Sequence, residues 1–195
     1  CTSLTTIYLS ASMETIKSYA FYGCINIQEI VVPQGVKIVS DYAFAECYEL
    51  TTIKIPSSVT YIGRGALYGC VKLESIFLPF VGAYKGGSRD DASLFGYIFG
   101  GLNDTYIAAD GSINNMTYVQ SNASSFWQFE QRYYNVRSFD SNFAPIAITE
   151  EDEGKELHST LYYVPKTLKT VNITNETVFG YGAFMNCDWL QNFYY

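Results

Sequence analysis

The stretch Ala43-Phe44-Ala45-Glu46-Cys47-Tyr48-Glu49-Leu50-Thr51-Thr52-Ile53-Lys54-Ile55-Pro56 decides the fold, because its pattern recurs along the chain. Each copy carries an alanine and a bulky apolar residue, then a cysteine, then a leucine with spaced aliphatic residues. The first four cysteines are Cys1, Cys24, Cys47 and Cys70, and consecutive ones lie 23 residues apart. A fixed period of this length is typical of a solenoid built from stacked repeats.

Each repeat has a strand half and a return half. In residues 50–55, Ile53 faces the opposite side to Thr52 and Lys54, which is the alternation of a strand, and Pro56 then ends the strand by removing a backbone donor. In residues 59–70 the apolar positions are three or four apart, which predicts a short helical turn with one buried stripe.

Stacked repeats place their strands side by side as a parallel ladder. We expect six such strands, because the leucine or isoleucine that opens the strand half occurs six times. These strands are predicted to begin near Leu4, Ile27, Leu50, Leu73, Leu168 and Leu190.

The repeat pattern is interrupted between residues 80 and 163. Residues 94–100 read as a glycine-rich version of the return half, whereas residues 102–160 are rich in Asn, Ser, Tyr and Phe. So much aromatic surface predicts an ordered insert, with short strands near residues 116–120, 127–136 and 161–164. We therefore expect one continuous solenoid domain: repeats in residues 1–79, a distorted repeat and insert in 80–163, and resumed repeats in 164–195.

The pattern Ala-Phe-x-x-Cys-x-x-Leu-x-x-Ile-x-Ile-Pro resembles the BspA-like class of leucine-rich repeats, over residues 1–79 and 164–195. The resemblance implies an α/β solenoid, a right-handed superhelix with a parallel β-sheet on one face and short helices or turns on the other. The class occurs mainly in surface and secreted proteins of gut and oral bacteria and in some mucosal protozoa. It therefore implies an extracellular or cell-surface location and an attachment role, and it supplies no catalytic motif.

The composition excludes two classes of function. The formal charge is −7 and the pI is about 4.6, with no basic stripe, which argues against a nucleic-acid partner. No apolar run approaches the roughly 20 residues of a membrane span. The chain opens at Cys1, inside a repeat, so we expect it to be a piece of a longer protein.

The cysteines, the single histidine and the acidic runs predict no catalytic, cofactor or metal site. Cysteines in one repeat slot point the same way, which suits buried thiols better than disulfides. The only histidine, His158, follows the charged residues 150–156, which read as a solvated loop. Paired carboxylates occur at Asp90 and Asp91 and in residues 150–153, without an apolar context that would raise a pKa.

The outward face of the predicted ladder is the first candidate binding surface. One outward column is short and polar: Thr6, Glu29, Thr52, Ser75, Thr170 and Asn192. The other is the candidate ligand-binding column: Tyr8, Val31, Lys54, Phe77, Asn172 and Tyr194. Exposed aromatic side chains on a sheet indicate a contact surface for a peptide or a sugar. The alternative is that the insert folds back and covers Phe77.

The aromatic insert is the second candidate. Trp127, Phe129, Tyr133 and Tyr134 would form a stacking platform for a sugar ring or a hot spot for a protein partner. The alternative is that they build the core of the insert or dock it onto the solenoid.

These features support a non-catalytic adhesion module that binds a host or microbial surface protein or a glycan. A structural spacer within a longer surface protein is the alternative, since the open start at Cys1 and the bare end at Tyr195 leave core layers or strand edges without a cap. A glycan hydrolase is a third reading.

Overall fold

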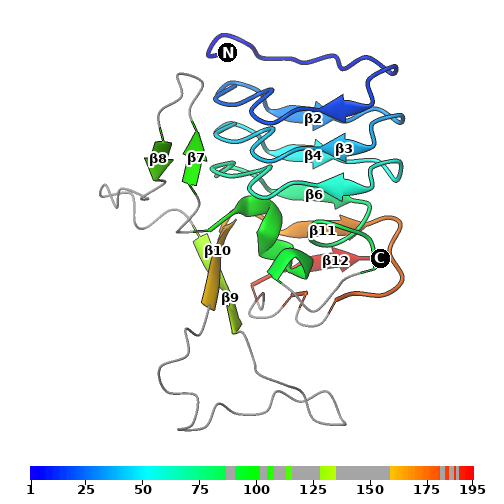
Figure 1. Cartoon of the computed structure of the whole chain (residues 1–195), viewed down its shortest axis with the longest axis vertical. Coiled ribbons are helices and arrows are strands. Elements are labelled where there is room, and N and C mark those ends of the chain that lie inside the picture. Colours follow the sequence, from blue (N-terminus) through cyan, green and yellow to red (C-terminus); the bar gives the residue numbers. More distant parts are fainter. Residues whose placement is uncertain are drawn as a thin grey trace, which may run out of the picture.

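The chain forms a solenoid of parallel strands, seen in a computed structural model that describes residues 1–86, 91–101, 105–107, 113–115, 128–134, 159–180, 183–184, 187 and 189–195 (Figure 1). The strands are β1 (Thr15–Ile16), β2 (Glu29–Val31), β3 (Ile38–Val39), β4 (Thr52–Lys54), β5 (Tyr61–Ile62), β6 (Ser75–Leu78), β7 (Thr105–Ile107), β8 (Ile113–Asn115), β9 (Gln128–Tyr134), β10 (Ser159–Pro165), β11 (Thr170–Ile173) and β12 (Asn192–Tyr194). Two short 3₁₀ helices, η1 (Asp91–Ser93) and η2 (Phe95–Phe99), lie between β6 and β7.

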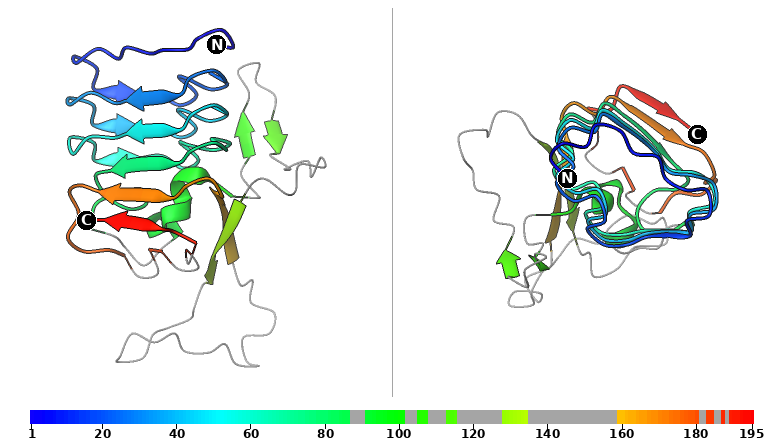
Figure 2. Two further views of the ribbon diagram at one scale, coloured as in Figure 1. Left: turned by 180° about the vertical axis from the view of Figure 1, so that it is seen from behind. Right: turned by 90° about the horizontal axis from the view of Figure 1, so that it is seen from above.

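Two parallel sheets build the stack (Figures 1 and 2). The larger has the order β12-β11-β6-β4-β2, and the smaller has the order β1-β3-β5. Paired residues in the first coils are one repeat apart, as in Ile30↔Ile53 and Ile53↔Ile76. The register of the ladder is therefore the sequence period itself, and the predicted solenoid is confirmed.

The core lies between the two sheets and follows the predicted alternation. In β4, Ile53 is buried, Thr52 is half-buried and Lys54 is exposed. The largest fully buried side chains are Tyr162, Phe44, Phe80, Phe95, Phe99, Ile16, Ile27, Ile30, Leu50, Ile53, Ile55 and Ile62. All of them except Tyr162 belong to one hydrophobic cluster that runs through the coils, so no coil buries its apolar stripe alone.

The return halves are hydrogen-bonded turns rather than the short helical turns predicted. The N–H of Phe44 donates to the carbonyl of Ala66 at 2.9 Å, and the N–H of Phe21 donates to Ala43 at 2.8 Å. These donors reach the next coil instead of a carbonyl four residues back, which a helix needs. The return halves also contain β1, β3 and β5, which pair with one another from coil to coil and form the second sheet. The periodicity did not indicate this sheet.

The first predicted strand, near Leu4, is wrong. Residues 1–14 contain no strand, although Leu4, Ile7 and Leu9 pack against the core as half-buried side chains. Apolar spacing brings side chains to the core, whereas a strand also needs backbone groups aligned with a neighbour.

A glycine makes room for a tyrosine in the third coil. Equivalent positions in successive coils are Tyr19, Tyr42 and Gly65, all with φ between 55° and 61°. A Cβ on Gly65 would lie 2.5 Å from the Tyr42 ring, so the ring occupies the space that a side chain would need. Tyr42 in turn stacks on Tyr19 with ring centroids 5.4 Å apart.

The distorted repeat predicted at residues 94–100 is η2, and it completes the coil that begins with β6. The N–H groups of Gly65 and Leu67 donate to the carbonyls of Tyr97 and Ile98, at 3.0 Å and 2.8 Å. These are the bonds that a regular return half would accept.

The insert leaves and rejoins the solenoid at one point, where Gly101 forms an antiparallel bridge with Tyr162. β9 pairs antiparallel with β10, and β7 with β8. After β10 the chain enters β11, which pairs with β6 in the register Thr170↔Ser75. Predicted strands at 127–136 and 161–164 correspond to β9 and β10, whereas the one at 116–120 lies outside the described residues.

A buried carboxylate secures the loop after β6. Glu176, which is only 6% exposed, accepts hydrogen bonds from the N–H of Val81 at 2.7 Å and of Gly86 at 2.6 Å. These bonds connect the loop after β6 to the coil that follows the insert. They therefore link the coils on the two sides of the insert.

Replacing Phe44 by Ala should lower the free energy of unfolding by about 3–5 kcal/mol, because it empties a central layer in which Phe44 is fully buried. Lys54→Ala should change it by no more than about 0.5 kcal/mol, since Lys54 is exposed. Urea denaturation of the two variants measures both values. Equal losses would contradict the assignment of inward and outward positions.

Candidate functional site

The ladder aligns most of the candidate column on the outer face of the five-stranded sheet. Paired positions run Val31↔Lys54, Lys54↔Phe77, Asn172↔Phe77 and Asn172↔Tyr194. Val31 and Tyr194 are 54% and 57% exposed, and Phe77 is half-buried. These five residues are named here the outer column.

Tyr8 does not share this alignment. It is 94% exposed and lies in the segment that forms no strand. The structure therefore gives it no rung of the ladder, although the sequence placed it in the same column.

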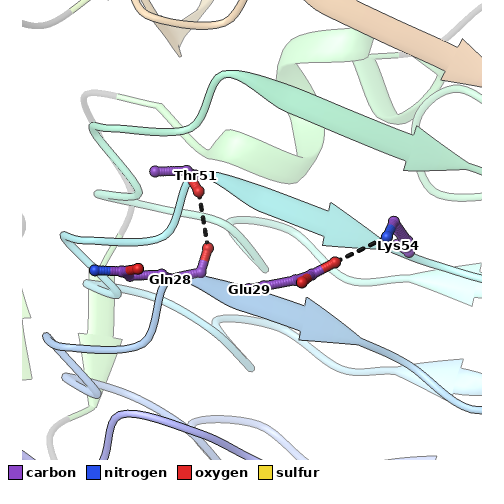
Figure 3. A network of polar contacts seen from close by, with 4 residues as sticks. All are labelled: Gln28, Glu29, Thr51 and Lys54. Carbon is purple, nitrogen blue, oxygen red and sulfur yellow. Dashed lines mark hydrogen bonds and ion pairs between the residues drawn. The ribbon is translucent and has the colours of Figure 1, made fainter.

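The charges on this face neutralise one another. The Lys54 ammonium lies 2.8 Å from the Glu29 carboxylate (Figure 3). The same ammonium lies 5.9 Å from the centroid of the Phe77 ring, which is within cation–π range. Beside this pair the hydroxyl of Thr51 donates to the carbonyl of Gln28 at 3.0 Å, joining the coils at the start of β4.

Next to the outer column lies a shallow depression of about 470 Å³. Its lining includes the outer-column residues Val31, Lys54 and Phe77, together with Pro33 and Pro56. The two prolines follow their strands one repeat apart, so they repeat along the stack. The sequence marked them only as strand ends, and their equal spacing is the signal that places them in one row.

Two described contacts show where the insert lies. β10 contacts η2, and Gly101 bridges to Tyr162. Figures 1 and 2 place β7 to β10 beside the edge at which the strands of the five-stranded sheet begin, and not over the outer face of that sheet. The described strands of the insert therefore leave the outer column uncovered.

The insert candidates are located only by their backbone. In β9, Phe129 pairs with Val164, Tyr133 with Thr160, and Tyr134 with Ser159. Trp127 lies outside the described residues. Whether these aromatic residues contact a partner stays a prediction.

Comparison with known proteins identifies the repeats. The BspA type leucine rich repeat region matches residues 1–83, in six copies. These residues are BspA type leucine-rich repeats. The resemblance inferred from the pattern Ala-Phe-x-x-Cys-x-x-Leu-x-x-Ile-x-Ile-Pro is confirmed over residues 1–83, and the coils formed by β11 and β12 extend the same ladder beyond the matched residues.

Two solved structures are similar in sequence to part of this chain. A T. pallidum leucine-rich repeat protein is 34% identical over 40% of this chain and 37% of its own, with a TM-score of 0.40. A leucine-rich repeat protein from Bacteroides ovatus ATCC 8483 is 36% identical over 51% of this chain and 24% of its own, with a TM-score of 0.42. The chain thus spans well under half the length of either protein. No curated protein matches the chain.

Four of the five cysteines are buried, and three of these lie in the BspA type repeats at one repeat spacing. Cys24, Cys47, Cys70 and Cys187 are buried, Cys1 is exposed, and no disulfide bond joins any two of the five. The Cys70 thiol donates to the carbonyl of Phe44 at 3.3 Å, and the Cys47 thiol donates to Phe21 at 3.4 Å. Burial raises the pKa of Cys70 well above its usual range and also raises the pKa of Cys24. Both effects favour the neutral thiol, which packs and does not react.

No other chemistry gathers in the part of the chain that the structure describes. There, no group of three His, Cys, Asp or Glu side chains is arranged to hold a metal ion. Nor does any helix of these residues have the length and apolar character needed to cross a membrane. His158, Asp90 and residues 150–153 lie outside the described residues.

A thiol reagent should modify one cysteine per native chain, Cys1, because the other four are buried. After denaturation all five should react, which absorbance or mass spectrometry counts. The Cys1→Ser variant is the control and should show no rapid labelling while folded. Fast labelling of Cys47 or Cys70 in the folded chain would contradict their burial.

Proposed function

We propose that this chain is a non-catalytic binding module of an extracellular or cell-surface protein, and that it contacts a protein or a glycan through its outer column. The observation that carries the proposal is the uninterrupted alignment of Val31, Lys54, Phe77, Asn172 and Tyr194 on a face that the described insert strands leave open. An exposed apolar surface with a polar surround is a common contact surface.

On this face, we expect binding to depend on apolar contact and shape complementarity more than on electrostatic attraction. Glu29 and Lys54 form an ion pair, and the neighbouring polar column ends in Thr170 and Asn192, whose side chains are joined by a 3.4 Å hydrogen bond. A neutral face does not steer a partner by long-range attraction. Binding should therefore depend on Phe77, Tyr194 and the adjoining depression, and only weakly on salt.

The proposed location rests on the repeat class. BspA type repeats are typically found in surface-associated proteins, and residues 1–83 are of this type. An acidic surface, with a pI of about 4.6, suits a soluble module held outside the cell.

A structural spacer is the second candidate. It is favoured by the continuity of the ladder, because β11 takes its place beside β6 without a shift in register despite the long insert. A rigid stack that tolerates insertion can act as a spacer whatever its faces contact.

The test is binding of the intact chain to an array of glycans and matrix proteins, repeated with the double variant Phe77→Ala/Tyr194→Ala. The intact chain should bind at least one probe, and the double variant should lose affinity by about tenfold or more, as expected for aromatic contact residues. Tyr48→Ala, which removes a 39% exposed tyrosine outside this face, is the matched control. No binding to any probe by the folded chain would favour the spacer.

Deleting residues 102–160 and joining Gly101 to Leu161 through a short Gly-Ser linker separates the two candidate surfaces. The ends are neighbours in space, because Gly101 bridges to Tyr162. The deletion should leave array binding within about twofold if the outer column is the contact surface. Binding lost with the deletion, and kept in Phe77→Ala/Tyr194→Ala, would move the site to the insert.

A further inference from the structure

A second exposed column lies on the smaller sheet. Its register pairs Thr15 with Ile38 and Ile38 with Tyr61. The N–H of Ile62 donates to the carbonyl of Ala83 at 3.0 Å, which brings Tyr84 to the next rung. These four outward positions are again one repeat apart in sequence. The column ends in two tyrosines side by side.

The two tyrosine rings form a partly open aromatic surface. Their centroids lie 5.1 Å apart with the planes tilted by 43°. Tyr84 is 56% exposed, whereas Tyr61 is half-buried. Tyr84 therefore presents an aromatic surface to solvent, and Tyr61 supports it from the coil before.

The Asp41 carboxylate lies beside this surface and can accept further hydrogen bonds. Asp41 Oδ1 accepts hydrogen bonds from the Tyr61 hydroxyl at 3.2 Å and from the Arg64 N–H at 2.9 Å. Within the described parts of the chain, its Oδ2 accepts no bond. The two bonds fix the orientation of the carboxylate, and Oδ2 remains available to a hydroxyl donor.

The neighbouring groups hold the site in place. The Arg64 guanidinium lies 6.0 Å from the Tyr97 ring centroid and 5.4 Å from that of Tyr162. Burial raises the pKa of Tyr61 and of Tyr97, so both hydroxyls remain protonated at neutral pH. The cluster is thus rich in neutral hydroxyl groups around one carboxylate.

The charged side chains near this surface indicate which class of ligand it can bind. An anion would be repelled by the Asp41 carboxylate. Arg64 and the exposed Lys85 lie close to Tyr61 and Tyr84 in sequence, and their positive charges would weaken the attraction of a cation. An uncharged sugar ring avoids both conflicts. It offers C–H groups to an aromatic surface and hydroxyl groups to a carboxylate oxygen and phenolic hydroxyls, the combination of aromatic surface and a few fixed polar groups that small ligands require.

We propose that Asp41, Tyr61 and Tyr84 form a binding site for an uncharged sugar residue of a glycan, separate from the outer column. Tyr84 provides the stacking surface, Asp41 Oδ2 accepts from a sugar hydroxyl, and Tyr61 positions both. The site does not depend on the partner proposed for the outer column.

Calorimetric titration of the intact chain with hexasaccharides tests this proposal. The neutral probes are cellohexaose, maltohexaose and mannohexaose, and the charged ones are a hyaluronan hexasaccharide and chitosan hexamer. The chain should bind at least one neutral probe more tightly than either charged probe. Tyr84→Ala should weaken this binding by about tenfold or more, and Asp41→Asn should weaken it while keeping an acceptor for Tyr61 and Arg64.

Two matched variants separate this site from the outer column. Tyr48→Ala removes an exposed tyrosine elsewhere and should bind the neutral probe as the unaltered chain does, whereas Phe77→Ala reports whether the outer column contributes to sugar binding. Thermal melts confirm that each variant is folded. The proposal is overturned if no neutral probe binds, if a charged probe binds more tightly, or if folded Tyr84→Ala and Asp41→Asn both bind normally. Loss in Phe77→Ala alone would assign the sugar to the outer column.

Discussion

Hydrogen bonding between coils is the constraint on which the structure depends. Backbone donors in strands and turns alike reach the next coil, as from Val32 to Lys54 at 2.9 Å and from Phe44 to Ala66 at 2.9 Å. Because these donors find their acceptors in an adjacent coil, the spacing of the coils is fixed and side chains align in columns. Both candidate surfaces are outward columns produced by this constraint.

The constraint also explains how the chain tolerates its interruption. A coil needs only a strand, a return half and correct partners, and it does not require that these be contiguous in sequence. η2 supplies the return half, while Thr167 donates to the carbonyls of Val71 and Leu73 at 2.9 Å and 2.8 Å as the chain re-enters the stack. Glu176 completes the closure. The described strands of the insert, β7 to β10, therefore lie outside the ladder, and β11 pairs with β6 in regular register.

The two surfaces differ in what holds them. The outer column lies on a five-stranded sheet, and its Lys54 forms an ion pair with Glu29. The second column lies where the smaller sheet meets η2, and its carboxylate is held by Tyr61 and by the Arg64 backbone. A module with two independent faces can bind two partners at once, which raises total affinity when both are on the same surface.

The sequence by itself determined the repeat class, the parallel ladder and the inward and outward positions, because a constant period leaves one register in which Ile53 and its counterparts are all buried. It also predicted a distorted return half at 94–100. Only the tertiary structure decided that the return halves are turns and that the segment near Leu4 forms no strand, because both depend on backbone partners in another coil. The tertiary structure also decided that Asp41, Tyr61 and Tyr84 are neighbours, because these three residues belong to three coils and come together only when the coils stack. The period of the sequence determines which side chains share a column. Contacts between columns depend on the backbone conformation of the turns within each coil.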